Sequence, residues 1–367
     1  MKNKSYSETI NSPTNKEIHL FAAANTKNGF VSFFDKTFCR DGISKIYILK
    51  GGPGCGKSTL MKNYAKSAKE KGLTPIYYHC SSDPDSLDGV TVKETGISIL
   101  DGTAPHVFDP VYPGVREFYI DLSQAWDKDL LSENKDRIIR LANQKSNCYK
   151  TAYRLLNAAG RVSDEMYETS KTFADLEKIK SFTRRFAHKY IKSKGTKQGR
   201  INEITVDAVS AKGIVRYFTP EKYATTLFFI KDAKMLGRFL LDELTDTVKK
   251  SGVSAVIALS PENPEKSVAV FLPESKVCVS LYDEGMAEAF EKEGKTVKII
   301  NASRFMKPEV YKECRQKFRF AEKCYETLRS AALSELSGAG AFHSELEKIY
   351  ISATDYAKVA EIGSSII

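Results

Sequence analysis

One segment of the chain carries the residue types of a phosphate-binding site. Residues 45–59 read KIYILKGGPGCGKST, in which a short apolar run stops at a cluster of glycines. The spacing fits G-x-x-x-x-G-K-[ST], the phosphate-binding loop (P-loop) motif, with a strand-like stretch before it and a helix-like stretch after it. Glycines let the backbone approach a phosphate closely, and the N–H groups of such a loop form an anion-binding nest. The segment therefore predicts a site for a nucleoside triphosphate.

The residue types of the loop assign an expected role to each position. Lys57 would reach the β- and γ-phosphates as a point charge, Ser58 would ligate Mg²⁺, and Thr59 would support the start of the helix. We expect the loop to bind the nucleotide through Gly51, Gly52, Pro53, Gly54, Cys55, Gly56, Lys57, Ser58 and Thr59. Cys55 is best explained as a small filler. A weaker alternative is that its oxidation blocks binding, because a helix N-terminus lowers the pKa of a thiol.

A second metal ligand is expected at the end of another strand. The run GISILDGT at 96–103 loses its apolar character at Asp101, which we predict to hold Mg²⁺ together with Ser58. The alternative is an aspartate at an ordinary strand-to-turn exit. Gly102 follows where many motor-type ATPases carry a water-activating glutamate, which argues against that class and against fast unassisted hydrolysis.

Acidic residues also follow the strand expected at 74–79. In HCSSDPDSLDGV (79–90), Asp88 and then Asp83 are the candidates for positioning a water or accepting a hydroxyl proton. The alternative is a turn in which these side chains cap backbone groups. His79 and Cys80 have no third residue at metal-ligand spacing.

A proline-rich stretch, TAPHVFDPVYPG (103–114), follows the expected Asp101 strand. His106 and Asp109 within it would either sense the γ-phosphate or serve as turn residues, and we prefer the second interpretation.

The elements that must position these residues alternate along the chain. We expect strands at 45–50, 74–79, 96–101 and near 118–122, and a helix at 57–71 that stops at Lys71-Gly72. This alternation predicts an α/β fold with a mostly parallel sheet and helices on both of its faces. Residues 129–192 carry apolar side chains at helical spacing and are expected to form a helical insert or lid.

The second half resembles a degenerate copy of the first. YILKGGPGCGKSTLM (47–61) aligns with FFIKDAKMLGRFLLD (228–242), and further matches keep an offset near 180 residues. Asp232 stands opposite Gly51, Arg238 opposite Lys57 and Phe239 opposite Ser58, so we predict a duplicated P-loop fold with one nucleotide site. The expected parts are a tail (1–16), a P-loop domain (17–128), the helical insert with a basic linker (129–200), a degenerate P-loop-like domain (201–350) and a C-terminal tail (351–367) that packs back as a short helix.

Composition limits the class of protein. The chain of 367 residues is 42% hydrophobic, contains no long apolar run, and starts with a polar stretch unlike a secretory signal. Seven cysteines without C-x-x-C spacing argue for a reducing compartment and against disulfides or zinc, so we expect a cytoplasmic protein without a membrane span. The net charge of +10 is concentrated in 178–200, which we interpret as a solvated helix face and linker. A nucleic-acid contact there stays open but is not favoured.

The strings HLFAAANTKNGF, GGPGCGKSTLMK, YHCSSDPDSLDGV and ILDGTAPHVFDPVYPG together resemble a family of bacterial, mostly Firmicute, tandem P-loop proteins. Members are labelled as ATPases, ATP-binding proteins or nucleotide kinases. The resemblance covers most of 17–160 and, more loosely, the second half, where this chain departs from the family at 232–239. It implies ATP and Mg²⁺ as ligands and supplies no physiological substrate.

Three functions follow from these features. The leading one is an Mg²⁺-dependent ATP-binding protein that hydrolyses ATP slowly as a switch or coupled step. The second is a kinase for a nucleotide or small molecule, with the helices at 129–192 closing over the acceptor. The third is a non-catalytic, regulatory ATP-binding module in which ATP orders an interface between the two halves of the chain. The chain contains no N-K-x-D motif for reading guanine, which favours ATP.

Overall fold

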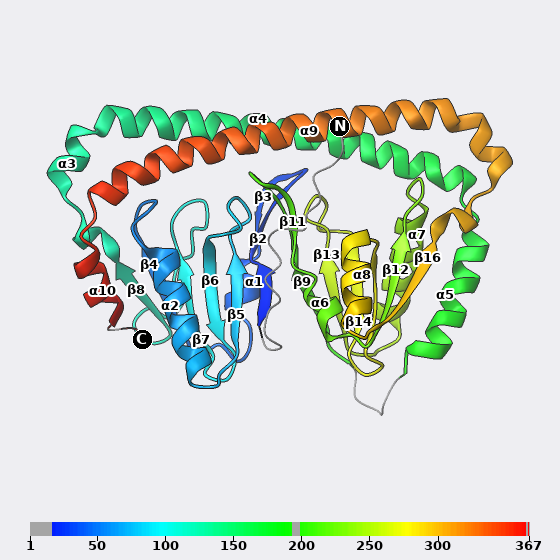
Figure 1. The fold of residues 1–367 in the computed structure, drawn as a ribbon, viewed down its shortest axis with the longest axis horizontal. Helices are drawn as coiled ribbons and strands as arrows, with labels where there is room; N and C mark the ends of the chain where they lie inside the picture. The colour runs from blue at the N-terminus through cyan, green and yellow to red at the C-terminus, as the bar shows by residue number, and fades with distance from the viewer. Residues whose placement is uncertain (1–16, 193–198, 365, 367) are drawn as a thin grey trace. The chain divides into compact units, whose positions relative to one another are not determined.

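The computed structural model describes residues 17–192, 199–364 and 366 (Figure 1). The tail expected at 1–16 and most of the expected flexible linker lie outside these residues. The chain forms two compact units. The first unit lies within Thr14–Asn157, Asp207–Tyr217 and Arg329–Ile367, and the described part of the second lies within Ala158–Val206 and Phe218–Leu328.

The sequence predicts contiguous domains, whereas the two units interleave along the chain. The reason is that two long helices, α4 (Lys135–Phe173) and α9 (Pro308–Ser352), each contribute residues to both units. The helices expected in 129–192 are present as α3 (Lys128–Glu133), α4 and α5 (Leu176–Tyr190).

Six strands of the first unit form one sheet region, in the order β1-β5-β6-β7-β4-β8. Their bounds are β1 Ile18–Phe21, β4 Lys45–Lys50, β5 Pro75–His79, β6 Leu87–Val92, β7 Ile97–Asp101 and β8 Glu117–Asp121. The pairs β1–β5, β4–β7 and β4–β8 are parallel, and β6 runs antiparallel to both of its neighbours. The expected parallel arrangement is therefore interrupted by a single reversed strand.

The second unit repeats this arrangement. Its strands follow the order β9-β13-β14-β15-β12-β16, with β14 antiparallel to both neighbours and the other pairs parallel. Their bounds are β9 Ile201–Thr205, β12 Thr226–Lys231, β13 Ala255–Leu259, β14 Ser267–Leu272, β15 Val277–Leu281 and β16 Thr296–Asn301. The two units thus share strand order and strand direction.

The strands expected from the sequence of the first unit are confirmed. β4, β5, β7 and β8 lie within about one residue of their expected bounds, and helix α2 (Lys57–Glu70) begins where the motif places it. Strand β6 was not expected, because Asp88 and Gly89 interrupt its apolar pattern and both residue types are depleted in strands. Its six residues are all buried, which compensates for the poor intrinsic preference.

Helices cover both faces of the strands in the first unit. Tyr77 packs with the apolar face of α2, whereas its neighbour Tyr78 packs against Phe38 of helix α1 (Phe34–Phe38) with ring centroids 5.0 Å apart. Successive residues of a strand point to opposite faces, so α1 and α2 lie on opposite sides. The core beneath α2 holds Leu49, Leu60, Met61, Tyr64, Ala65, Val90 and Ile99, among others.

The second unit is covered in the same way. Phe228 packs against Phe186 of α5, and α5 in turn contacts helix α7 (Leu236–Lys250). The next residue, Phe229, stacks with Phe290 of helix α8 (Glu284–Lys292) on the other face. Helix α6 (Thr219–Tyr223) precedes β12.

The remaining elements of the first unit are two hairpins and a C-terminal helix. The hairpins are β2–β3 (Ala23–Thr26 and Gly29–Ser32) and β10–β11 (Asp207–Ser210 and Gly213–Arg216). After α9 the chain continues into α10 (Tyr356–Ser364), which contacts the 3-10 turn η1 (Leu122–Ala125). The short C-terminal helix that the sequence predicts to pack back is therefore present. A matching 3-10 turn, η2 (Ala302–Phe305), precedes α9 in the second unit.

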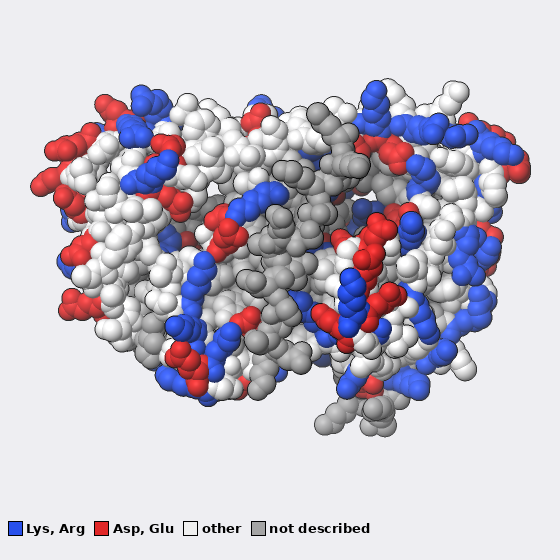
Figure 2. Space-filling view, viewed as in Figure 1, with Lys and Arg blue, Asp and Glu red and all other residues white. Residues whose placement is uncertain are grey.

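The basic segment expected at 178–200 is largely the exposed face of α5. Lys and Arg side chains follow this helix in Figure 2, and Lys178, Lys180, Arg184, Arg185 and Lys189 are exposed. The apolar residues interleaved with them pack inward, since Ile179 and Phe186 are buried. This amphipathic pattern matches the solvated-face interpretation. None of the described helices combines the length and apolar character needed to cross a membrane.

Candidate nucleotide site

The glycine-rich loop connects β4 to α2 and carries two residues with left-handed backbone. Gly54 has φ 69° and Gly56 has φ 89°, and only glycine adopts such angles without strain. Gly56 is the N-cap of α2, and no side chain caps the helix start. The first-turn N–H groups therefore lie at a helix N-terminus with its partial positive charge, as an anion-binding site requires.

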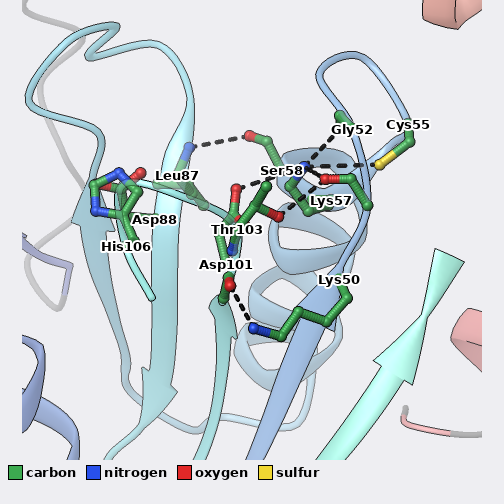
Figure 3. Close-up of polar contacts among 12 residues, drawn as sticks. Lys50, Gly52, Cys55, Lys57, Ser58, Leu87, Asp88, Asp101, Thr103 and His106 are labelled. Carbon is green, nitrogen blue, oxygen red and sulfur yellow. Dashed lines mark hydrogen bonds and ion pairs between the residues drawn. The ribbon is translucent and has the colours of Figure 1, made fainter. Parts of the chain in front are cut away.

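Lys57 folds back over this loop (Figure 3). Its Nζ donates hydrogen bonds to the carbonyl oxygens of Gly51 and Gly52, at 2.8 and 2.7 Å. The same nitrogen lies 3.6 Å from the carboxylate of Asp101. Two neutral carbonyl oxygens and one carboxylate thus hold the Lys57 ammonium over the loop. A charged phosphate oxygen is a stronger acceptor than a carbonyl, so it would replace the two carbonyls.

Asp101 reaches this position because β4 and β7 are parallel neighbours. The register places Leu49 opposite Asp101, so both strands end at the same edge beside the loop. One carboxylate oxygen accepts the N–H of Thr103 at 2.8 Å, and the Thr103 hydroxyl donates to the Gly51 carbonyl at 2.9 Å. Lys50 Nζ donates to the Gly102 carbonyl at 2.6 Å. These bonds fix the strand ends that carry Asp101 and the loop.

Ser58 lies in the first turn of α2, half-buried. Its Oγ accepts the backbone N–H of Leu87 at 3.1 Å, which links the helix start to β6. Thr59 is exposed on the next position of the helix. Ser58 and Asp101 both offer hard oxygen donors beside the loop, the type that Mg²⁺ prefers, so the residues present fit this ion.

Cys55 is a packed side chain inside the loop. It is 1% exposed and belongs to a small core with Leu122, Ala125 and Val359. Burial raises the pKa of its thiol, whereas the sequence-based alternative of a reactive cysteine needs a lowered pKa. The burial and packing of Cys55 support the filler interpretation. A Cβ at Gly51 would lie 2.6 Å from the Cys55 Sγ, which explains a glycine there.

The outer side of the loop is packed against the end of α9 and the start of α10. A Cβ added at Gly52 would lie 2.7 Å from the Tyr350 ring, and one at Gly54 would lie 2.9 Å from Ile351 Cγ1. The Tyr356 hydroxyl donates to the Gly54 carbonyl at 2.6 Å. The glycines are thus needed on both sides of the loop. The sequence does not predict these contacts, because the residues of α9 and α10 that make them lie about 300 positions from the loop and carry no motif.

Asp88 lies in strand β6 and is 3% exposed, so it is not part of the exposed loop expected from the sequence. Burial raises the pKa of its carboxyl to about 6. His106 Nε2 approaches the carboxylate to 3.4 Å, and the imidazole stacks on the Phe34 ring at 5.1 Å. His106 is 7% exposed, so it is more than a solvated turn residue. Asp109, by contrast, is exposed.

Asp83 lies on the surface turn between β5 and β6. It accepts the Ser86 hydroxyl at 2.7 Å, the pattern of an aspartate that stabilises a turn. Lys212 of the β10–β11 hairpin lies 3.4 Å from it and also contacts Asp85. Of the two acidic candidates, Asp88 is thus adjacent to the residue that bonds Ser58, whereas Asp83 is paired with a surface lysine.

The loop of the second unit that aligns with the P-loop has a different shape. It holds residues 232–235 between β12 and α7, against 51–56 between β4 and α2. The Asp232 carboxylate accepts the N–H of Gly237 at 2.6 Å, so a side chain of the chain itself lies at this helix N-terminus.

Comparison of the whole chain with protein-family models, with curated proteins and with solved structures gives no match.

Proposed function

We propose that the first unit binds MgATP in the loop 51–56 and hydrolyses it slowly, as a switch or a coupled step. The observation that carries this proposal is the position of Lys57 Nζ. It lies over a glycine loop at an uncapped helix N-terminus, 3.6 Å from the carboxylate that ends the adjacent parallel strand. A lysine, a helix N-terminus and a carboxylate in this relation are the parts that phosphoryl transfer requires.

The roles of the residues follow from their positions. The loop N–H groups and Lys57 would bind the phosphate oxygens and stabilise the charge that develops on the transferred phosphoryl group. Ser58 and Asp101 would hold Mg²⁺, which neutralises charge on the β- and γ-phosphates when bound. Asp88 and Asp83 stay the proposed groups for positioning a water. The burial of Asp88 and its place one residue from the partner of Ser58 support it over Asp83.

The packing of α9 and α10 against the loop supports the switch. Tyr350 and Tyr356 contact the outer side of Gly52 and Gly54, so a change of loop conformation on nucleotide binding must move or tighten these contacts. The same observation favours the second candidate function, a non-catalytic module in which ATP orders the C-terminal helices for a protein partner. A nucleotide or small-molecule kinase stays an alternative that the experiment below separates.

We further propose that the two units arose by duplication and that the second lost its nucleotide site. The shared strand order and direction support this, together with the alignment of 47–61 with 228–242. The resemblance to tandem P-loop proteins of bacteria agrees with it. We also propose a cytoplasmic location, as the composition of the chain predicts.

Turnover of γ-labelled ATP by the full chain tests the proposal. The reaction contains Mg²⁺, with and without a panel of nucleoside monophosphates and small metabolites, and Lys57→Ala is the control. Label released as phosphate by the wild type alone supports the slow ATPase, and label on one panel member indicates a kinase. If neither the wild type nor Lys57→Ala turns over ATP, and ATP binding still depends on Lys57, the result supports the regulatory module. ATP binding at wild-type affinity by Lys57→Ala would contradict the site itself.

A further inference from the structure

A cysteine, an aspartate and a histidine converge beside the proposed nucleotide site. Cys80 follows β5, Asp88 lies in β6, and His106 lies in the stretch between β7 and β8. One ligand atom from each, a thiol sulfur, a carboxylate oxygen and a ring nitrogen, lies within 4.8 Å of the other two. No zinc spacing is visible along the chain because the three donors come from three separate segments, which only the sheet brings together.

A β-bulge places Asp88 in this cluster. Tyr78 pairs with Gly89 and His79 pairs with Leu87, so Asp88 is skipped in the ladder. A bulge bends the strand and redirects the side chain of the extra residue. Here Asp88 and the cysteine that follows β5 come together at the same end of the β5–β6 pair.

Two atoms of the cluster are buried and lack hydrogen-bond partners. These are Asp88 Oδ2 and His106 Nδ1, and no hydrogen bond to either is found among the described residues. The 3.4 Å approach of His106 Nε2 to Asp88 Oδ2 is too long for a good hydrogen bond. A buried polar atom without a partner destabilises the folded chain, and an ion bound between these side chains would remove that cost at each atom that binds it.

The equivalent bulge of the second unit has no such chemistry. There Ala258 pairs with Ala269 and Leu259 with Ser267, so the skipped residue is Val268, which is buried. The scaffold therefore accepts an apolar residue at this position. The ionisable side chain in the first unit needs a reason other than the architecture of the sheet.

We propose that Cys80, Asp88 and His106 bind a divalent transition metal ion of the zinc type. The mixed S, N and O donor set suits Zn²⁺ and not Mg²⁺, which prefers oxygen alone. With bond lengths of about 2.0–2.3 Å, ligand atoms of a tetrahedral zinc site stand roughly 3.3–3.8 Å apart, so a small closure of the cluster accommodates the ion. Three protein ligands leave a fourth position for water or another oxygen ligand.

The metal donors are distinct from the proposed Mg²⁺ ligands Ser58 and Asp101. They do include Asp88, so with the metal bound Asp83 is the remaining acidic candidate for positioning a water. Leu87, which precedes Asp88, donates its N–H to Ser58 Oγ, so the metal would fix the strand that supports the helix start. The stacked ring of Phe34 and the edge-on ring of Phe30 hold the His106 imidazole in place. This inference does not rest on nucleotide binding, because all three donors lie outside the loop 51–56.

Titration of the metal-free full chain with Co²⁺ tests the proposal. Cobalt bound tetrahedrally through a thiolate gives a sulfur-to-cobalt charge-transfer band in the near ultraviolet and strong visible bands. We expect one equivalent to produce both, and Zn²⁺ to displace it. Cys80→Ser should abolish the charge-transfer band. His106→Gln removes a direct ligand, so it should weaken Co²⁺ binding by more than the roughly 10–100-fold that loss of an outer-shell partner costs.

Control variants keep the result decisive. Cys148→Ser, at a half-buried cysteine of α4, should keep the full spectrum. Lys57→Ala should lose ATP binding yet keep Co²⁺ binding, which separates failure of the nucleotide proposal from failure of this one. Asp88→Val copies the residue at the equivalent bulge of the second unit, so it should fold and lose Co²⁺ binding. A wild type without cobalt bands, or bands that persist in Cys80→Ser and Asp88→Val, would overturn the proposal.

Discussion

The loop after β4 and the loop after β12 follow equivalent strands of two sheet regions that share strand order, yet the helix after each loop begins differently. Gly54 and Gly56 leave the start of α2 without a capping side chain. In the second unit the Asp232 carboxylate bonds the N–H of Gly237, and the loop is two residues shorter (232–235 against 51–56). The start of α2 is thus open to an external acceptor, whereas a carboxylate of the chain itself accepts an N–H at the start of α7.

The same contrast extends across the edge of the sheet. The stretch between β7 and β8 carries buried His106 in the first unit, whereas the second unit has helix α8 between β15 and β16. Asp88 in one bulge corresponds to Val268 in the other. The fold therefore requires neither ionisable residue, and this contrast is the basis of the proposed metal site.

The largest expected difference between the two loops concerns nucleotide affinity. Lys57→Ala should weaken binding of MgATP about 100-fold or more, or about 2.7 kcal/mol, because it removes charge-assisted hydrogen bonds to phosphate. Arg238→Ala, at the aligned position of the second unit, should leave the affinity unchanged. Titration with a fluorescent ATP analogue measures both. Equal losses in the two variants would break the distinction between the loops.

The second effect is a loss of stability at Gly54, where both the backbone angle and the packing of α9 require a glycine. Gly54→Ala places a Cβ at φ 69°, 2.9 Å from Ile351 Cγ1 and 3.0 Å from the Glu347 carbonyl. We expect the free energy of unfolding, measured in urea, to fall by about 2–3 kcal/mol, of which about 1 kcal/mol is backbone strain.

Gly72→Ala is the matched control for this effect. Gly72 has φ 76° and no atom within 4 Å of an added Cβ, so its substitution should cost the strain of about 1 kcal/mol alone. Equal costs at Gly54 and Gly72 would mean that the packing of α9 against the loop contributes nothing.

A smaller effect is expected at the loop of the second unit. Asp232→Ala removes the acceptor of the Gly237 N–H and should destabilise the chain by about 1 kcal/mol, as loss of a helix N-terminal cap does. Thermal unfolding measures this change. MgATP binding should stay at one equivalent, because the shorter loop still cannot surround a phosphate. A second equivalent in Asp232→Ala would show that the carboxylate alone excludes the nucleotide.

The smallest expected effect is an increase in stability. Lys276 is exposed and has φ 52° in the turn between β14 and β15, where the corresponding turn of the first unit has Gly96 with φ 66°. Lys276→Gly should stabilise the chain by up to about 1 kcal/mol through relief of left-handed strain. Lys276→Ala retains the strain and should show no such gain in the melting temperature.

Much of the first unit follows from local patterns in the sequence. The glycine spacing and the apolar run before it place β4, the loop and α2, and the alternation of apolar stretches places β5, β7 and β8. Strand β6 was missed because Asp88 and Gly89 break its pattern, and the burial that stabilises it comes from neighbouring strands. The position of Asp101 could be predicted because the end of a parallel strand beside the loop is set by the fold class.

The residues suited to bind a phosphate can be identified from the chain alone, since glycine spacing and a lysine at a helix start are local properties of the backbone. The side chains that surround them depend on tertiary packing. Tyr350 and Tyr356 reach the loop from about 300 residues away, and Cys80, Asp88 and His106 meet through a bulge and a sheet edge. Such contacts depend on how long helices and neighbouring strands pack, and packing between distant segments leaves no periodic pattern along the chain.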